Sequence, residues 1–347
     1  MTNKNISRRT VIQGVSALAG ALALGGLGET FAQKPAERPT LVILWLNGGP
    51  AGLFNSANSF LRSGAFGVTE RNISDLGNGL YVDAGSFGAL PPAARAHMAS
   101  INFQHGIVRP HDVARAAVLE NGKSSQLLRM AAAMPAGVPN RCAVVNDLGL
   151  PKGVSARPPA QSGVPLDFVM DFDSIRTRDI DQVRSAYGVA SDTKYIANQS
   201  STFAAVEALV RADAGVIFAQ PAYTGRPDRQ FDTHRDGNGE LARKIMEPIT
   251  PMLAMFLDRV MALPDRNVVT MLVGEWSRTH PESDHAPGGT ATVIGKHVKT
   301  GTAGPQNADG SPLPNAPSPE AIWAYAAAAL RLAKTPFGRN PNPELIV

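Results

Sequence analysis

The clearest pattern along the chain is a series of short apolar runs separated by stretches with helical spacing. The first run, Pro39 to Leu46 (PTLVILWL), is unbroken and rich in β-branched residues, which is typical of a strand buried on both faces. Because apolar runs alternate with helical segments, we expect an α/β fold. Further runs of this kind occupy residues 101–105, 142–145, 215–218 and 267–273.

Three segments place apolar residues at helical spacing. Ser201 is the expected cap of a helix over residues 201–213, and Ser318 caps a helix expected over 319–333. The third segment, residues 240–263, contains two prolines that must kink or divide it.

Two segments rich in Pro, Gly and Ser, residues 148–164 and 300–319, are expected to be surface loops. Strands and helices recur on both sides of the first loop, and one helix follows the second. A single domain over residues 33–347 is therefore the simpler prediction.

The N-terminus has the features of an export signal. The pair Arg8-Arg9 precedes a weakly apolar, glycine- and alanine-rich stretch over residues 11–27, which is typical of a twin-arginine signal. That stretch is too short and glycine-rich to be a stable membrane span, and residues 30–32 form a small-x-small cleavage site. We predict a signal peptide over residues 1–32, handled by the twin-arginine translocase, and a periplasmic or secreted mature chain without a membrane span. An uncleaved anchor is the alternative.

Composition narrows the possible partners and cofactors. The formal net charge is only +4, and basic residues do not interleave with aromatic ones, so a nucleic-acid surface is not expected. A single cysteine, Cys142, excludes an intramolecular disulfide. The glycines form neither a dinucleotide nor a Walker pattern. Since the twin-arginine pathway moves folded chains, export suits a protein that acquires a metal ion or another cofactor in the cytoplasm.

Asp232 and His234 form the first group of candidate metal ligands. They stand two positions apart in a polar stretch with nearby glycines. In an extended segment both side chains lie on one face, with Cα atoms about 6 to 7 Å apart. The alternative is a solvent-exposed loop in which the aspartate turns the chain.

A second group follows the apolar run 267–273. Glu275 stands where that strand is expected to end, which is where open α/β sheets bind ligands; alternatively, it pairs with Arg278 and fixes the turn. Asp284 and His285 stand side by side in a loop nine residues later. Carboxylates and imidazoles without a thiolate favour zinc, manganese or a similar divalent ion.

Two further residues are candidates by position. His111 begins a helical segment shortly after the strand that ends near His105, so we expect it at the ligand edge of the sheet. Asn47 ends the first strand, and the glycines after it form either an anion-holding turn or a tight structural turn.

Four stretches together resemble the twin-arginine-exported family known as domain of unknown function 1501, in the alkaline phosphatase and sulfatase-like superfamily. The resemblance covers most of the mature chain and implies a large mostly parallel or mixed sheet between helices, as in alkaline phosphatase. The stretches are residues 41–55, the triplet Asp232-Thr233-His234, residues 269–279, and Asp284-His285 with residues 295–305 (GKHVKTGTAGP).

The resemblance implies hydrolysis of a small anionic phosphate or sulfate ester by a metal-activated nucleophile. Family members usually carry an aspartate where Ala51 stands, so Asn47 becomes a candidate substitute ligand. A non-catalytic exported binding or assembly protein with a degenerate metal site is the alternative. In the catalytic reading His111 or Arg278 contacts the substrate, and the ion is surrounded by Asp232, His234, Glu275, Asp284 and His285.

Overall fold

The computed structural model describes most of the chain after the predicted signal peptide. That peptide and its cleavage site lie outside the described residues, as do Ala51 and most of the predicted loop 148–164. No helix in the described part is long and apolar enough to cross a membrane. The described residues are 37–50, 52–54, 61, 64–122, 124–135, 142–146, 163–221, 231–304 and 306–347.

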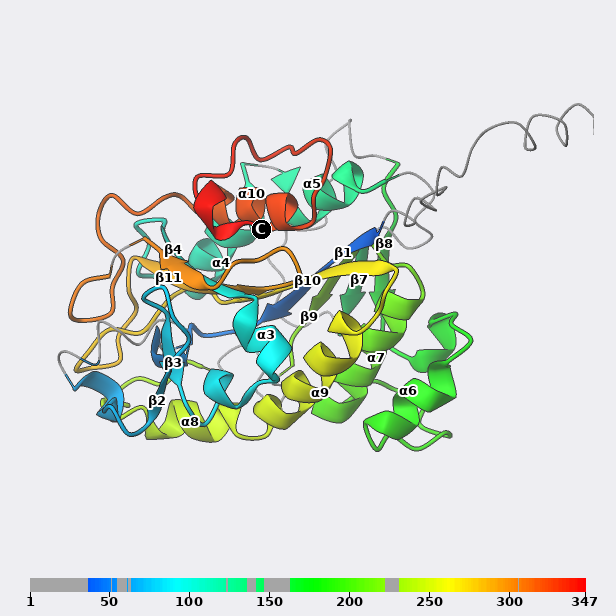
Figure 1. The fold of residues 1–347 in the computed structure, drawn as a ribbon, viewed down its shortest axis with the longest axis horizontal. Helices are drawn as coiled ribbons and strands as arrows, with labels where there is room; N and C mark the ends of the chain where they lie inside the picture. The colour runs from blue at the N-terminus through cyan, green and yellow to red at the C-terminus, as the bar shows by residue number, and fades with distance from the viewer. Residues whose placement is uncertain are drawn as a thin grey trace, which may run out of the picture. The chain divides into compact units, whose positions relative to one another are not determined.

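A mixed eight-stranded sheet forms the centre of the described chain, in the order β12-β4-β11-β10-β1-β9-β7-β8 (Figure 1). Of these strands only β11 runs antiparallel to its neighbours. All five apolar runs predicted as strands are confirmed, as β1, β4, β7, β9 and β10. The strands are β1 (Arg38–Trp45), β4 (Met98–Gln104), β7 (Cys142–Val145), β8 (Leu166–Val169), β9 (Val216–Ala219), β10 (Arg266–Val273), β11 (Gly288–Ile294) and β12 (Gly301–Ala303).

Strand β1 lies in the interior of the sheet, paired in parallel with β10 on one side and β9 on the other. Its residues from Pro39 onward are buried. Val42 and Leu44 pack on one face of the sheet, whereas Ile43 and Trp45 pack on the other, as the two-residue period of a strand requires.

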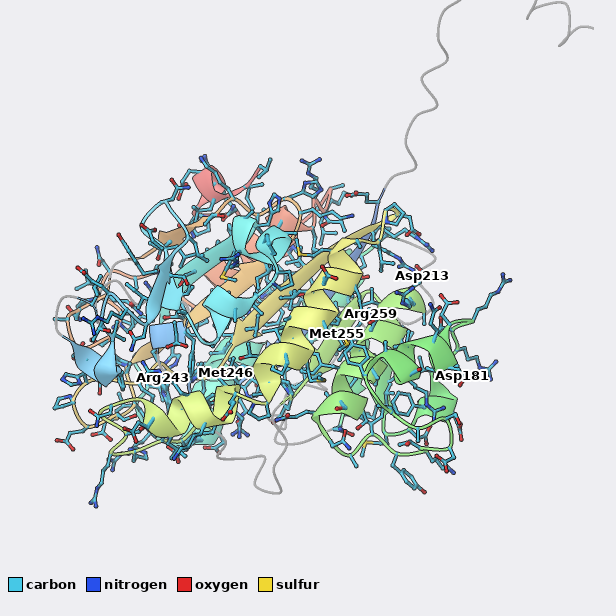
Figure 2. The ribbon with its side chains drawn as sticks, turned by 60° about the horizontal axis from the view of Figure 1, so that its bottom comes forward. Asp181, Asp213, Arg243, Met246, Met255 and Arg259 are labelled. Atoms are coloured by element: carbon cyan, nitrogen blue, oxygen red, sulfur yellow. The ribbon has the colours of Figure 1, made fainter. Side chains whose placement is uncertain are left out.

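Helices cover both faces of the sheet, which confirms the predicted fold class (Figure 1). Figure 2 shows one helical face, with Arg243 and Met246 on α8 and Met255 and Arg259 on α9. That face is covered by α3 (Pro92–Ala96), α6 (Ile180–Ala186), α7 (Gln199–Arg211), α8 (Glu240–Met246) and α9 (Ile249–Met261). The other is covered by α4 (His111–Leu119), α5 (Gln126–Ala133) and α10 (Glu320–Ala329). Two small sheets pair β2 (Ile73–Asp75) with β3 (Tyr81–Asp83) and β5 (Glu120–Asn121) with β6 (Ser124–Ser125).

The predicted cap of α7 is wrong. The helix starts at Gln199 because Asn198 is the cap. The Asn198 side chain accepts from the Ser201 backbone N–H, and the Ser201 hydroxyl accepts in return from the Asn198 N–H. Ser201 is thus the third helical residue of a reciprocal capping box.

In three other places the structure gives element boundaries more finely than the sequence prediction does. The apolar stretch 240–263 is divided into α8 and α9, which meet at Pro248. Helix α10 ends at Ala329, four residues before the predicted end. The short strand β12 pairs with β4 inside the predicted loop 300–319.

One edge of the sheet collects the chemistry-bearing loops. Strands β1, β4, β9 and β10 all point the same way, so their carboxyl ends share this edge, and antiparallel β11 begins there. Asn47 follows β1, Glu275 follows β10, and His285 precedes β11. Ligand sites of α/β sheets occupy such an edge.

Candidate metal centre

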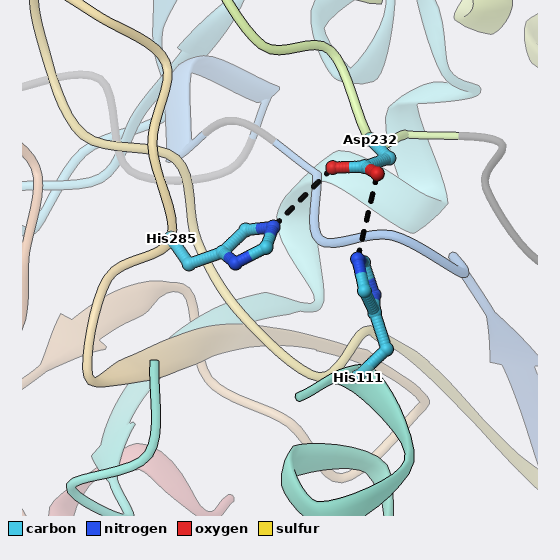
Figure 3. A group of neighbouring side chains, drawn as sticks. All are labelled: His111, Asp232 and His285. Atoms are coloured by element: carbon cyan, nitrogen blue, oxygen red, sulfur yellow. Dashed lines mark hydrogen bonds and ion pairs between the residues drawn. The ribbon is translucent and has the colours of Figure 1, made fainter. Parts of the chain in front are cut away.

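Asp232 lies at the middle of the site (Figure 3). Its segment is attached to the end of β1 because the Phe231 N–H donates to the Asn47 carbonyl over 2.7 Å. Figure 3 shows the rings of His111 and His285 directed at the two oxygens of this carboxylate. The Asp232 carboxylate lies 2.9 Å from His234 Nε2, 3.3 Å from His285 Nε2 and 3.4 Å from His111 Nε2.

Each of these three imidazoles is held at its other nitrogen by an oxygen acceptor. An acceptor at Nδ1 favours the tautomer that carries its proton there, which leaves Nε2 as the atom available to a metal ion. The acceptors are Glu275 Oε1 for His111 (2.9 Å), the Val108 carbonyl for His285 (2.9 Å) and Asp284 Oδ1 for His234 (3.0 Å).

The donor set fits a divalent cation. One ligand atom each from His111, Asp232 and His285 lies within 4.8 Å of the others. Two imidazoles and one carboxylate form a common protein ligand set for catalytic zinc and related divalent ions. Because the three side chains come from the start of α4 and from two separate loops, only the folded chain assembles this set.

Glu275 lies just after β10, as predicted, and its side chain lies behind His111. That side chain is fully buried, and Oε1 also accepts from the Gly48 N–H over 3.0 Å. Its Oε2 atom has no hydrogen-bond partner within the described part of the chain. A carboxylate bound to the far nitrogen of a ligating histidine orients that ring. The geometry therefore favours Glu275 as the partner of His111 rather than as a ligand.

Arg278 is also buried, and it pairs with Asp232 over 2.7 Å rather than with Glu275. Its guanidinium donates further hydrogen bonds to the carbonyls of Gly48, Gly49 and Ser283. Arg278 thus holds the Asp232 carboxylate in position, and its contact with a substrate stays a prediction.

The exposed side of the site is formed by His234 and Asp284, whose side chains are 42% and 58% exposed. Asp232 and His285 are only 13% and 8% exposed. Asp284 thus lies at the surface as the partner of His234, whereas His285, its neighbour in sequence, points inward.

Asn47 and Gly48 connect β1 to the site. The buried Asn47 side chain accepts from the Trp45 indole N–H over 3.2 Å, and its part as a substitute ligand stays a prediction. Gly48 has a φ of +94°, and a Cβ there would lie 2.4 Å from the Asp232 nitrogen. Glycine is therefore required for the close approach of these two segments.

The charges of Asp232 and His111 stabilise each other. Burial by itself would raise the pKa of Asp232, but hydrogen bonds from His111, His285 and Arg278 outweigh it and hold that pKa far below its usual range. Burial likewise would lower the pKa of His111, yet its bonds to Asp232 and Glu275 raise it to about 9. A cation that binds His111 at neutral pH therefore displaces a proton.

Two residues of the site were not singled out from the sequence. The Trp276 ring stacks on His285 with centroids 3.7 Å apart, and it meets the His111 ring in a T-shaped arrangement with centroids 4.5 Å apart. His105 bonds through Nε2 to the Glu275 carbonyl over 2.7 Å, and burial lowers its pKa. Trp276 lies just after β10 and His105 just after β4, and this position at a strand end is the sequence signal that could have identified them.

Comparison with known proteins leaves the function open. No family model and no curated protein matches the sequence. Three of the similar solved structures have TM-scores near 0.4, and likenesses of this degree do not assign a function. The first is the lipoteichoic acid synthase LtaP from Listeria monocytogenes, with 9% identity over 88% of this chain and 75% of that one and a TM-score of 0.41. The second is a protein in the alkaline phosphatase superfamily from Vibrio parahaemolyticus, with 11% identity over 88% of this chain and 70% of that one and a TM-score of 0.42. The third is the phosphonate monoester hydrolase SpPMH from Silicibacter pomeroyi, with 10% identity over 89% of this chain and 76% of that one and a TM-score of 0.36.

Proposed function

We propose that this chain is an exported, metal-dependent hydrolase of phosphate or sulfate esters. The observation that carries the proposal is the convergence of His111 and His285 on Asp232, with each Nδ1 already bound to an oxygen. The largely shielded Asp232 carboxylate supplies a negatively charged oxygen ligand, and the two Nε2 atoms that face it supply neutral nitrogen ligands once His111 has lost its proton. The proposed ion is zinc or manganese.

The ligand residues are His111, Asp232 and His285, and Glu275 orients His111 from behind. A divalent ion at this position supplies Lewis-acid polarisation of the ester oxygens and stabilises developing negative charge. Arg278 holds the Asp232 carboxylate in place through its hydrogen bond. His234, the most exposed of the three imidazoles, is available to hold or release a proton at Nε2.

The choice of ester class rests on the sequence resemblance to the domain of unknown function 1501 family. The proposed location, periplasmic or secreted, rests on the twin-arginine pattern at residues 7–12. The ester class and the location can each be tested by experiment independently of the metal site.

The first test is elemental analysis of the purified full chain, compared with the double variant Asp232→Ala, His285→Ala. Wild type is expected to retain about one divalent ion per chain after incubation with zinc or manganese and dialysis, and the variant none. Asp258→Asn, an exposed substitution on α9, is the matched control and should bind like wild type.

A panel of phosphate and sulfate esters then tests the reaction. Turnover that disappears in the double variant supports the hydrolase. A wild-type chain that binds no ion overturns the metal centre. An ion bound without turnover of any ester instead favours the exported binding or assembly protein with a degenerate site.

A further inference from the structure

A polar cavity of about 500 Å³ lies between the two loops that carry His234 and Asp284. Its volume is within the range of roughly 300 to 1,000 Å³ that small-molecule sites occupy. One wall is the segment after His234, and the other is the loop before Asp284. The side chains that matter are Arg235, Asp236, Asn238 and Glu240 on the first wall and Glu282 on the second.

The two walls are attached to each other. The Arg235 N–H donates to the Glu282 carbonyl over 2.8 Å, and the Thr233 and Ser283 hydroxyls lie 3.3 Å apart. Gly237 packs so closely on the second wall that a Cβ there would lie 2.9 Å from the Pro281 carbonyl oxygen. The contacts that shape the cavity therefore join the same two loops that carry His234 and His285.

The cavity lies beside the exposed side of the candidate metal centre. Arg235 directly follows His234, and Glu282 stands two residues before Asp284. His234 and Asp284 are bonded to each other over 3.0 Å and are the solvent-exposed members of the site. A substrate that reaches the centre from this side has its remaining part next to the cavity.

The lining has both donors and acceptors. Asp236 is already occupied, because its two oxygens accept from backbone N–H groups at the start of α8. Glu240 and Glu282 supply acceptors, whereas Arg235 and Asn238 supply donors. Hydroxyl groups donate and accept at once, so neighbouring hydroxyls match such a lining. A second anion would face two carboxylates, and an apolar group would desolvate polar side chains without replacing their bonds.

We propose that this cavity binds a polyhydroxylated, sugar-like alcohol group of the ester substrate. This inference rests on the proposed function, because the anionic ester group is then held at the metal centre. It makes Glu240, Glu282 and Arg235 specificity-determining residues.

The kinetic test uses the full chain loaded with zinc or manganese. Values of kcat/KM are measured for monosaccharide phosphates and sulfates and for the corresponding nitrophenyl esters. In Glu282→Gln and Glu240→Gln, the ratio of sugar-ester to nitrophenyl-ester kcat/KM is expected to fall about tenfold, since each variant weakens a charge-assisted hydrogen bond to a hydroxyl. Glu247→Gln changes an exposed glutamate just after α8 that does not line the cavity, and this variant should keep the wild-type ratio.

A binding test separates the cavity from catalysis. Saturation-transfer NMR is recorded on chelator-treated wild type with glucose, galactose, ethanolamine and methyl phosphate as probes. Transfer to the sugars, lost in Arg235→Gln with Glu282→Gln, supports the inference even if no ester is turned over and the hydrolase proposal fails. Turnover of nitrophenyl esters with an unchanged ratio in the variants and no transfer to sugars overturns the inference alone. Preferential transfer to ethanolamine or methyl phosphate also overturns it.

Discussion

Glu275 accepts a hydrogen bond from His111 over 2.9 Å, between residues 164 positions apart in the chain. The contact crosses from the end of β10 to the first residue of α4. It controls which nitrogen of His111 faces Asp232, and through that the availability of the metal-binding atom.

Glu275→Gln is therefore expected to weaken metal binding without removing a ligand. The amide is uncharged and supports the histidine tautomer less strongly, so zinc affinity should fall about 10- to 100-fold. A competition titration against a chromogenic chelator measures this, with Asp258→Asn as the control. Wild-type affinity in Glu275→Gln would exclude the assigned role.

Trp276 contacts the imidazole rings of His111 and His285, and its indole N–H donates to the Ile107 carbonyl over 2.6 Å. Trp276→Phe keeps an aromatic ring but loses this bond, so the free energy of unfolding should drop by about 1 kcal/mol. Addition of Co²⁺ should quench the fluorescence of wild type, and this quenching should be much smaller in Trp276→Phe. Trp323→Phe is the matched control, because Trp323 is also buried and bonded to a carbonyl. Equal quenching in both variants would contradict the prediction.

We expect the bonds of Glu207 to make the free energy of unfolding acid-sensitive, independently of the metal site. Its buried carboxylate accepts from Arg259, Arg211 and the Tyr187 hydroxyl. Burial would raise the pKa of Glu207, but these bonds outweigh it and hold that pKa below its ordinary value. A lowered folded-state pKa stabilises the protein above the pKa of the unfolded chain, and this stabilisation is lost as the pH falls through the folded-state value.

Glu207→Gln should consequently lower the free energy of unfolding by roughly 3 to 5 kcal/mol at pH 7, because it leaves arginines without their buried partner. Its loss of stability between pH 7 and pH 3 should be smaller than that of wild type. Urea unfolding at a series of pH values gives both quantities. Parallel pH profiles for the two proteins would show that Glu207 is not the titrating group.

The arginine pair predicts the route of export. Replacement of Arg8 and Arg9 by lysine should abolish transport and leave the full-length chain in the cytoplasm, since the translocase reads that pair. Cell fractionation and intact mass of the exported wild type check this, with a mature start expected near Gln33. Undiminished export of the variant would contradict a twin-arginine route, and an exported chain that retains residues 1–32 would favour the anchor.

The sequence by itself determined the central strands and placed several site residues at the ends of strands or the start of a helix. Strands β1 and β10 are buried on both faces, and that environment selects the continuous apolar runs from which they were predicted. The start of α4 at His111 was likewise predicted, because the apolar spacing of that helix begins there. Such signals are local, so one sequence is sufficient to carry them.

Only the tertiary structure decided which side chains meet. Glu275 and Arg278 are three residues apart, yet one bonds to His111 and the other to Asp232. Those partners depend on strand order and on the direction of β11, which bring loops far apart in sequence to the same edge of the sheet. Local spacing places a residue near an edge, but the direction of its side chain and the atom that it faces follow from long-range packing.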